Sequence, residues 1–113
     1  MINTSELFAN QSLELRRGTI VLAILSLLKQ PRYGYALLQA LETDGMPVDA
    51  GTLYPLLRRL EKQGVLESSW DTTDSRPRKY YRLSTQGFEL YEMLQAEWHT
   101  TSEILKKMMK EEQ

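Results

Sequence analysis

The stretch GTLYPLLRRLEKQG, residues 51–64, decides the fold of this chain. Its four leucines recur at i, i+3, i+4 and i+7, which is the spacing of one apolar helical face. Asp49 and Thr52 can each cap this helix, because both carry a side-chain oxygen that accepts a hydrogen bond from the first turn. If Thr52 is the cap, Pro55 costs nothing in the first turn; if Asp49 is the cap, Pro55 should kink the helix. Gly64 then ends the helix as a left-handed cap.

The side of this helix opposite the leucines carries small groups and cations. With residues placed 100° apart, it holds Gly51, Pro55, Arg58 and Lys62, flanked by Tyr54 and Arg59. Such a face is typical of a recognition helix in the major groove of DNA, because arginine pairs with guanine through two hydrogen bonds and lysine meets phosphate. An ordinary solvated helix face has a similar composition, so the helix alone leaves both interpretations open.

A first helix is predicted from about Leu13 to Lys29, and Pro31 prevents it from continuing. Between residues 20 and 28 this helix is apolar on nearly every face, unlike an amphipathic surface helix. It must therefore bury two sides, which is more than a monomer of 113 residues can cover. This pattern indicates a homodimer.

The segments around the deciding helix complete a winged helix-turn-helix. A second helix runs from about residue 33 or 34 to 43, and strands at 66–71 and 78–83 flank the turn-rich segment 72–77. The hairpin carries four cations within seven residues, interleaved with Tyr80 and Tyr81, at least one of which should be core. Its basic side chains can straddle the DNA backbone or enter the minor groove, and a solvated turn is the alternative. The predicted contacts of the hairpin are Arg76, Arg78 and Lys79.

A long last helix is predicted from about Thr85 to Met109, capped by Ser84 or Thr85. Six of its residues are spaced alternately three and four apart, which is the 3.5-residue period of a coiled-coil seam. We expect this seam to pack against the partner subunit, including the partner's first helix. The predicted dimerisation residues are Tyr91, Leu94, Trp98, Leu105 and Met108, and Thr101 completes the seam.

The whole chain is therefore predicted to be mainly α, in an α+β arrangement. Residues 1–83 form the winged helix-turn-helix with its N-terminal helix, and residues 84–113 form the dimerisation helix. The net charge is −1, but it divides into +2 for residues 1–83 and −3 for residues 84–113. DNA binding needs a local basic patch rather than a basic chain, so this charge permits it.

Several classes of protein are disfavoured by what the chain contains. There is no cysteine and a single histidine, His99, expected on the surface, so neither a disulfide nor a transition-metal site is expected. No pair of titratable groups is placed for catalysis, so we expect neither an enzyme nor a cofactor. The apolar run of residues 20–28 is too short to span a bilayer and lacks a signal-peptide cleavage site, which favours the cytoplasm and no membrane partner.

Three motifs in the right order resemble the PadR family of bacterial transcriptional regulators: residues 51–64, Tyr33-Gly34-Tyr35, and RKYYRLS at residues 78–84. The resemblance covers the chain from about Leu13 to the last helix. It implies a homodimeric winged-helix repressor that binds an inverted-repeat operator, with Tyr33 and Tyr35 near the DNA backbone. The short chain resembles the small subgroup with one C-terminal helix.

Some members of that subgroup bind flat aromatic drugs between paired tryptophans at the dimer centre. Trp98 matches that position, and its seam neighbours Leu94 and Thr101 would line the same site. A planar aromatic effector is therefore one expectation, and two indoles packed simply as core is the other.

The combined prediction is a sequence-specific DNA-binding regulator, a repressor released by a small-molecule effector. A winged-helix module that binds a partner protein and no DNA is the alternative. The operator, the regulated genes, the identity of the effector and the sign of regulation do not follow from the sequence. The residues predicted to bind DNA are Tyr33, Tyr35, Thr52, Tyr54, Pro55, Arg58, Arg59, Lys62, Arg76, Arg78 and Lys79.

Overall fold

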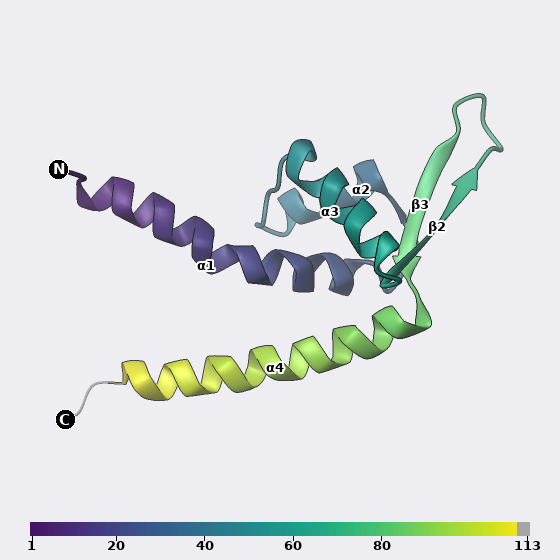
Figure 1. Cartoon of the computed structure of the whole chain (residues 1–113). Coiled ribbons are helices and arrows are strands. Elements are labelled where there is room, and N and C mark those ends of the chain that lie inside the picture. Colours follow the sequence, from purple (N-terminus) through teal and green to yellow (C-terminus); the bar gives the residue numbers. More distant parts are fainter. Residues whose placement is uncertain (111–113) are drawn as a thin grey trace.

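The computed structural model describes residues 1–110, so residues 111–113 of the predicted dimerisation segment 84–113 lie outside the described residues. Within them the helices and strands follow the order helix, strand, helix, helix, strand, strand, helix (Figure 1). This order confirms the predicted fold class, a mainly helical winged helix-turn-helix. The elements are α1 (Thr4–Leu27), β1 (Arg32–Tyr33), α2 (Gly34–Thr43), α3 (Ala50–Lys62), β2 (Leu66–Asp71), β3 (Arg78–Leu83) and α4 (Thr85–Met109).

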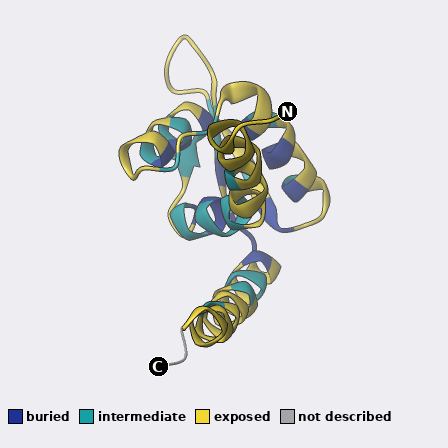
Figure 2. Cartoon of the chain, turned by 90° about the vertical axis from the view of Figure 1, so that its left-hand side faces the viewer, coloured by how far each residue is buried: buried dark blue, intermediate teal, exposed yellow. Residues whose placement is uncertain are grey.

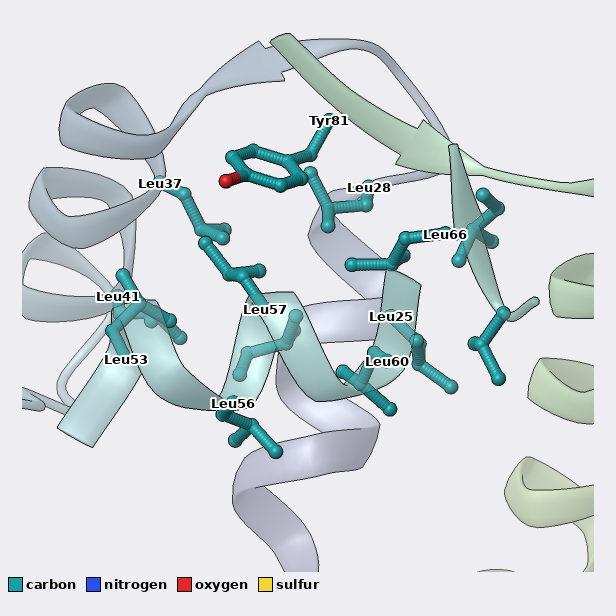
Figure 3. Close-up of a cluster of buried hydrophobic side chains, with 13 residues drawn as sticks. Leu25, Leu28, Leu37, Leu41, Leu53, Leu56, Leu57, Leu60, Leu66 and Tyr81 are labelled. Atoms are coloured by element: carbon teal, nitrogen blue, oxygen red, sulfur yellow. The ribbon is translucent and has the colours of Figure 1, made fainter. Parts of the chain in front are cut away.

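The core forms where α1, α2 and α3 meet the sheet (Figure 3). The four leucines of α3 all point into it, as their spacing predicted. Tyr81 is buried, which confirms that one wing tyrosine belongs to the core. Each fully buried leucine contributes about 1.5–3 kcal/mol to folding, so this cluster holds the helices in place. Its members are Ile24, Leu25, Leu28, Leu37, Leu41, Leu53, Leu56, Leu57, Leu60, Val65, Leu66, Tyr81 and Leu83.

Asp49, rather than Thr52, caps α3. Its Oδ1 accepts a hydrogen bond of 2.7 Å from the backbone N–H of Thr52. Pro55 therefore lies in the second turn, where its ring removes the N–H that would bond to the Gly51 carbonyl. Gly51 is exposed, so water can reach that carbonyl. Gly64 follows the helix at φ +83°, the left-handed conformation predicted for it.

The first helix starts earlier than predicted and ends earlier. It begins at Thr4 rather than near Leu13, because the Asn3 side chain accepts a hydrogen bond of 2.9 Å from the Glu6 N–H and forms an N-cap. It ends at Leu27 rather than Lys29, where the N–H of Leu28 bonds to the carbonyls of residues 24 and 25. The prediction followed the apolar run and missed this polar cap.

The wing is the hairpin of β2 and β3, residues 66–83, and both strands have the predicted bounds. They pair antiparallel, from Leu66 opposite Leu83 to Asp71 opposite Arg78. The sheet has a third strand that the sequence analysis missed, since β1 adds two residues to the outer edge of β3. This pairing fixes Tyr33, the residue before α2, against the wing.

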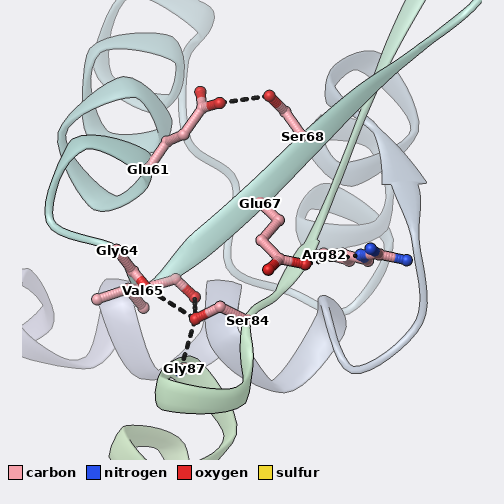
Figure 4. Close-up of polar contacts among 8 residues, drawn as sticks. All are labelled: Glu61, Gly64, Val65, Glu67, Ser68, Arg82, Ser84 and Gly87. Atoms are coloured by element: carbon pink, nitrogen blue, oxygen red, sulfur yellow. Dashed lines mark hydrogen bonds and ion pairs between the residues drawn. The ribbon is translucent and has the colours of Figure 1, made fainter.

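The last helix leaves the body of the molecule at Ser84. The Ser84 Oγ accepts from the Gly87 N–H at 2.9 Å and donates to the Gly64 carbonyl at 2.6 Å, so one side chain caps α4 and holds the residue that ends α3 (Figure 4). Beyond this junction most of α4 is exposed, as is the first half of α1 (Figure 2). None of the described helices combines the length and the apolar character needed to cross a membrane.

Gly87→Ala should destabilise the protein, because the junction has no room for a methyl group. A Cβ at residue 87 would lie 2.1 Å from the backbone carbonyl oxygen of Val65. Since backbone must move, we expect a loss of about 1–3 kcal/mol, measured by urea unfolding. Gly18→Ala is the matched control, because a Cβ there meets nothing within 4 Å. Equal stability of the two variants would contradict this packing.

Candidate nucleic-acid interface

The recognition face consists of the exposed side chains on α3 opposite its buried leucines. Five predicted DNA-binding residues lie on it. Its three cations take part in none of the ion pairs found within residues 1–110. The face therefore presents charges that no carboxylate of the described chain neutralises. Its members are Thr52, Pro55, Arg58, Arg59 and Lys62.

Tyr54, also predicted to bind DNA, packs against the core and lies close to the first residue of α2. It is half-buried, and a Cβ added at Gly34 would lie 2.6 Å from its Cε1 atom. Only glycine at position 34 leaves room for this ring. Tyr54 therefore fixes α3 against the start of α2.

Tyr33 lies between α2 and the wing, in a network that the sequence did not reveal. Its ring stacks on Tyr80, with centroids 4.3 Å apart. Its hydroxyl donates to Asp71 Oδ2 at 2.8 Å and lies 3.0 Å from the Tyr80 hydroxyl. These bonds to Tyr80 and Asp71 raise the pKa of Tyr33 above its ordinary value. Hydrogen bonds from Thr73 and Tyr33 lower the pKa of Asp71, which stays ionised.

Four predicted residues from distant segments line one groove. The groove has a volume of about 480 Å³ and lies between the first turn of α2 and the wing. The Arg78 guanidinium lies 5.0 Å above the Tyr33 ring, within range of a cation–π interaction, and 3.7 Å from Asp74. The residues that line the groove are Tyr33, Tyr35, Ala36, Gln39, Arg76 and Arg78. Two arginines and two tyrosines at one edge suit a phosphate backbone.

Lys79 differs from the other predicted cations because its carboxylate partner lies on α3 and the pair is partly buried. Its Nζ lies 3.2 Å from Glu61 Oε1, and the two side chains are 29% and 32% exposed. Glu61 belongs to the last turn of α3, so this ion pair joins the recognition helix to the wing. In the sequence Glu61 is not distinguished from any other charged residue of a helix surface.

The helix cleft is the space between α1 and α4 on both sides of Trp98. Trp98 is 45% exposed, and cavities of about 360 and 300 Å³ flank it. The predicted ligand residues Leu94 and Thr101 line the smaller cavity, and Tyr91 lines the larger. His99, exposed as predicted, has its ring 5.0 Å from that of Trp98. Further along α4, Leu105 and Met108 are 44% and 74% exposed.

A winged helix-turn-helix with an unpaired basic face on its third helix and a basic groove beside its wing defines the class of DNA-binding regulators. Residues 21–93 match the family described as transcriptional regulator PadR-like. The chain belongs to this PadR-like family, as its motifs predicted.

Solved structures and sequence relatives agree with this assignment. A PadR family transcriptional regulator from Eggerthella lenta is 44% identical, with a TM-score of 0.90 over 96% of each chain. An uncharacterised protein of Lysinibacillus sphaericus is 35% identical over 82% of this chain and 90% of its own length. A transcriptional regulator of Mycobacterium tuberculosis is 44% identical over 55 residues, which are 49% of this chain and 51% of that protein. The relatives with an assigned role are transcriptional regulators rather than enzymes.

Proposed function

We propose that this regulator is a homodimeric, cytoplasmic repressor that binds an inverted-repeat operator and is released by a small-molecule effector. The observation that carries the proposal is the unpaired recognition face of α3 beside the basic groove of the wing. Residues 1–83 bind the DNA in this proposal, and the segment 84–113 holds the dimer together.

The DNA contacts divide into base readout and backbone positioning. Two copies of α3 enter successive major grooves, on half-sites about one helical turn apart. Arg58 reads a base edge, with Arg59 and Lys62 beside it. Tyr33, Tyr35, Arg76 and Arg78 hold the phosphate backbone from the groove. Lys79 is left out of this set because its ammonium faces Glu61.

The dimer is supported by what α4 leaves uncovered. Leu105 and Met108 continue the seam of Leu94 and Trp98 past the point where α1 covers it. Exposed apolar side chains in a row gain free energy when a second copy covers them. A dimer also matches the two-fold symmetry of an inverted repeat.

The decisive experiment uses the DNA upstream of the protein's own gene. We expect the purified wild-type protein to bind an inverted repeat there more tightly than a scrambled duplex of equal length, at a stoichiometry of two chains per repeat. Fluorescence anisotropy of labelled duplexes measures both. Equal affinity for both duplexes, or no binding, would favour a protein-interaction module over an operator-binding regulator.

The effector site is proposed at the helix cleft. A planar aromatic molecule between Trp98 and its symmetry mate would gain about 0.5–1.5 kcal/mol from each offset-stacked pair, and a cationic one would gain more. Such a ligand releases DNA only if it binds the two states of the dimer with different affinity. The cavities on both sides of Trp98 leave room for it.

Planar aromatic drugs should change the emission of Trp98 and weaken operator binding. The second tryptophan, Trp70 in the wing, is 63% exposed and would add its own signal. The titration therefore uses a Trp70→Phe background, with Trp98→Phe as the control for DNA release. Unchanged emission and unchanged DNA binding across a broad panel would leave the two indoles as plain packing.

A further inference from the structure

Glu61 connects the recognition helix to both strands of the wing. One carboxylate oxygen accepts from the Ser68 hydroxyl on β2 (Figure 4), and the other lies 3.2 Å from the Lys79 ammonium on β3. The bond from Ser68 lowers the pKa of Glu61 below its ordinary value, with Lys79 helping. Burial lowers the pKa of Lys79, but the hydrogen bond and charge of Glu61, together with Tyr81, outweigh burial, and the pKa is raised. Both groups are therefore charged at neutral pH.

This ion pair is more sheltered than the other ion pairs of the wing. The side chains of Arg78 and Asp74 are 52% and 69% exposed, and those of Arg82 and Glu67 are 62% and 54% exposed. Exposed pairs are screened by water and salt, and they open readily to a phosphate. The Lys79 ammonium is held further by the Tyr81 ring, 5.2 Å below it. Lys79 is thus the wing cation that is hardest to move to DNA.

We propose that Glu61 is a specificity-determining residue that keeps Lys79 from neutralising a phosphate and so limits binding to DNA of arbitrary sequence. The inference rests on the proposed DNA binding. Non-specific affinity comes from phosphate neutralisation, which releases condensed counterions and makes the slope of log K against log salt more negative by about 0.9 for each cation. A lysine already neutralised by a carboxylate contributes nothing to that slope. Base readout by the recognition face does not depend on Lys79, so withholding it raises the ratio of specific to non-specific binding.

Glu61→Gln tests the proposal, because glutamine loses the charge but keeps an oxygen for Ser68. Binding to a random-sequence duplex is measured from 50 to 300 mM salt. We expect the salt slope of Glu61→Gln to be steeper than that of the wild type by about 0.9. If the two proteins bind equally at 1 M salt, the variant then binds roughly eightfold more tightly than the wild type at 0.1 M salt. In the presence of competitor DNA, Glu61→Gln should increase the affinity for the operator less than it increases the affinity for random-sequence DNA.

Three controls separate this effect from a structural one. Lys79→Ala in the wild-type background should leave the slope unchanged, and Glu61→Gln with Lys79→Ala should return to the wild-type slope. Glu67→Gln is the matched control, because Glu67, on β2, also pairs with a cation of β3. It should not alter the salt slope, because its partner Arg82 is exposed and already free to reach a phosphate. Circular dichroism and thermal unfolding check that each variant is folded.

Each outcome bears on the proposal. If Lys79→Ala has a salt slope flatter than the wild type by about 0.9, Lys79 already contacts phosphate in the wild-type protein. That result would overturn the inference without any Glu61 variant. An unchanged slope in Glu61→Gln, or a steeper slope that Lys79→Ala does not reverse, would overturn it as well. In all these cases the wild-type protein still binds its operator. Failure of the wild-type protein to bind any duplex would overturn the proposed function itself.

Discussion

Leu105→Asp is expected to turn the proposed homodimer into a folded monomer that no longer binds its operator. Leu105 is 44% exposed near the end of α4, and in the proposed dimer the second copy covers it. Covering a leucine is worth about 1.5–3 kcal/mol, and the two-fold axis removes each contact twice. The buried carboxylate adds the cost of leaving water. A single half-site cannot hold a monomer, because both copies of α3 contribute to affinity.

Sedimentation at micromolar concentration measures the loss of the dimer, and a binding titration with the operator measures the loss of DNA affinity. Leu94→Asp is a poorer probe, since Leu94 packs against the core of its own chain and the change would also unfold the protein. Thr100→Asp is the matched control, because it adds the same charge to an exposed position of α4 off the seam. A wild-type protein that sediments as a folded monomer would remove the basis of the proposed dimer.

Local patterns explain why so much of the fold was predictable. The leucines of α3 recur with helical spacing, and the strands 66–71 and 78–83 are bounded by turn residues, so the elements that build the winged helix follow from short segments. Three requirements of local geometry were also visible: a polar cap before α4, a glycine after α3 and a proline after α1. These features act within a few residues of the chain.

What escaped prediction depends on contacts between distant segments. The strand β1 has two residues, too few for a period, and exists because β3 offers it a free edge. Glu61 reads as a solvated helix acid until the wing brings Ser68 and Lys79 against it. Asp71 is an acid beside the basic patch in the sequence, but in the fold it accepts a hydrogen bond from the Tyr33 hydroxyl and thereby positions a residue of the groove.

These contacts also change the meaning of basic composition. The sequence places Lys79 among the wing cations on equal terms with Arg76 and Arg78. In the structure Lys79 faces a carboxylate and is 29% exposed, whereas the ion pair of Arg78 is longer, at 3.7 Å, and its partner Asp74 lies on an exposed loop. Under the proposed role of Glu61, a count of cations therefore overestimates the charge that the wing offers to DNA.

Simultaneous replacement of Arg58, Arg59 and Lys62 with alanine should abolish specific operator binding. Arg58→Ala alone should cost roughly 1–3 kcal/mol at each half-site and relax specificity at one base position. With two half-sites and three cations, the triple variant should lose at least about 4 kcal/mol, or roughly a thousandfold. The fold should survive, because all three side chains are exposed and none belongs to an ion pair found within residues 1–110.

The matched control removes the same charge elsewhere. Lys106, Lys107 and Lys110 are exposed on the last turn of α4 and just beyond it, away from the wing and the recognition face. Their joint replacement with alanine lowers the net charge equally, so a long-range electrostatic effect would weaken operator binding in both variants alike. Only a direct role of α3 predicts a large loss in one and a small loss in the other. Operator binding that survives in the α3 variant would mean that another surface of this protein reads the DNA.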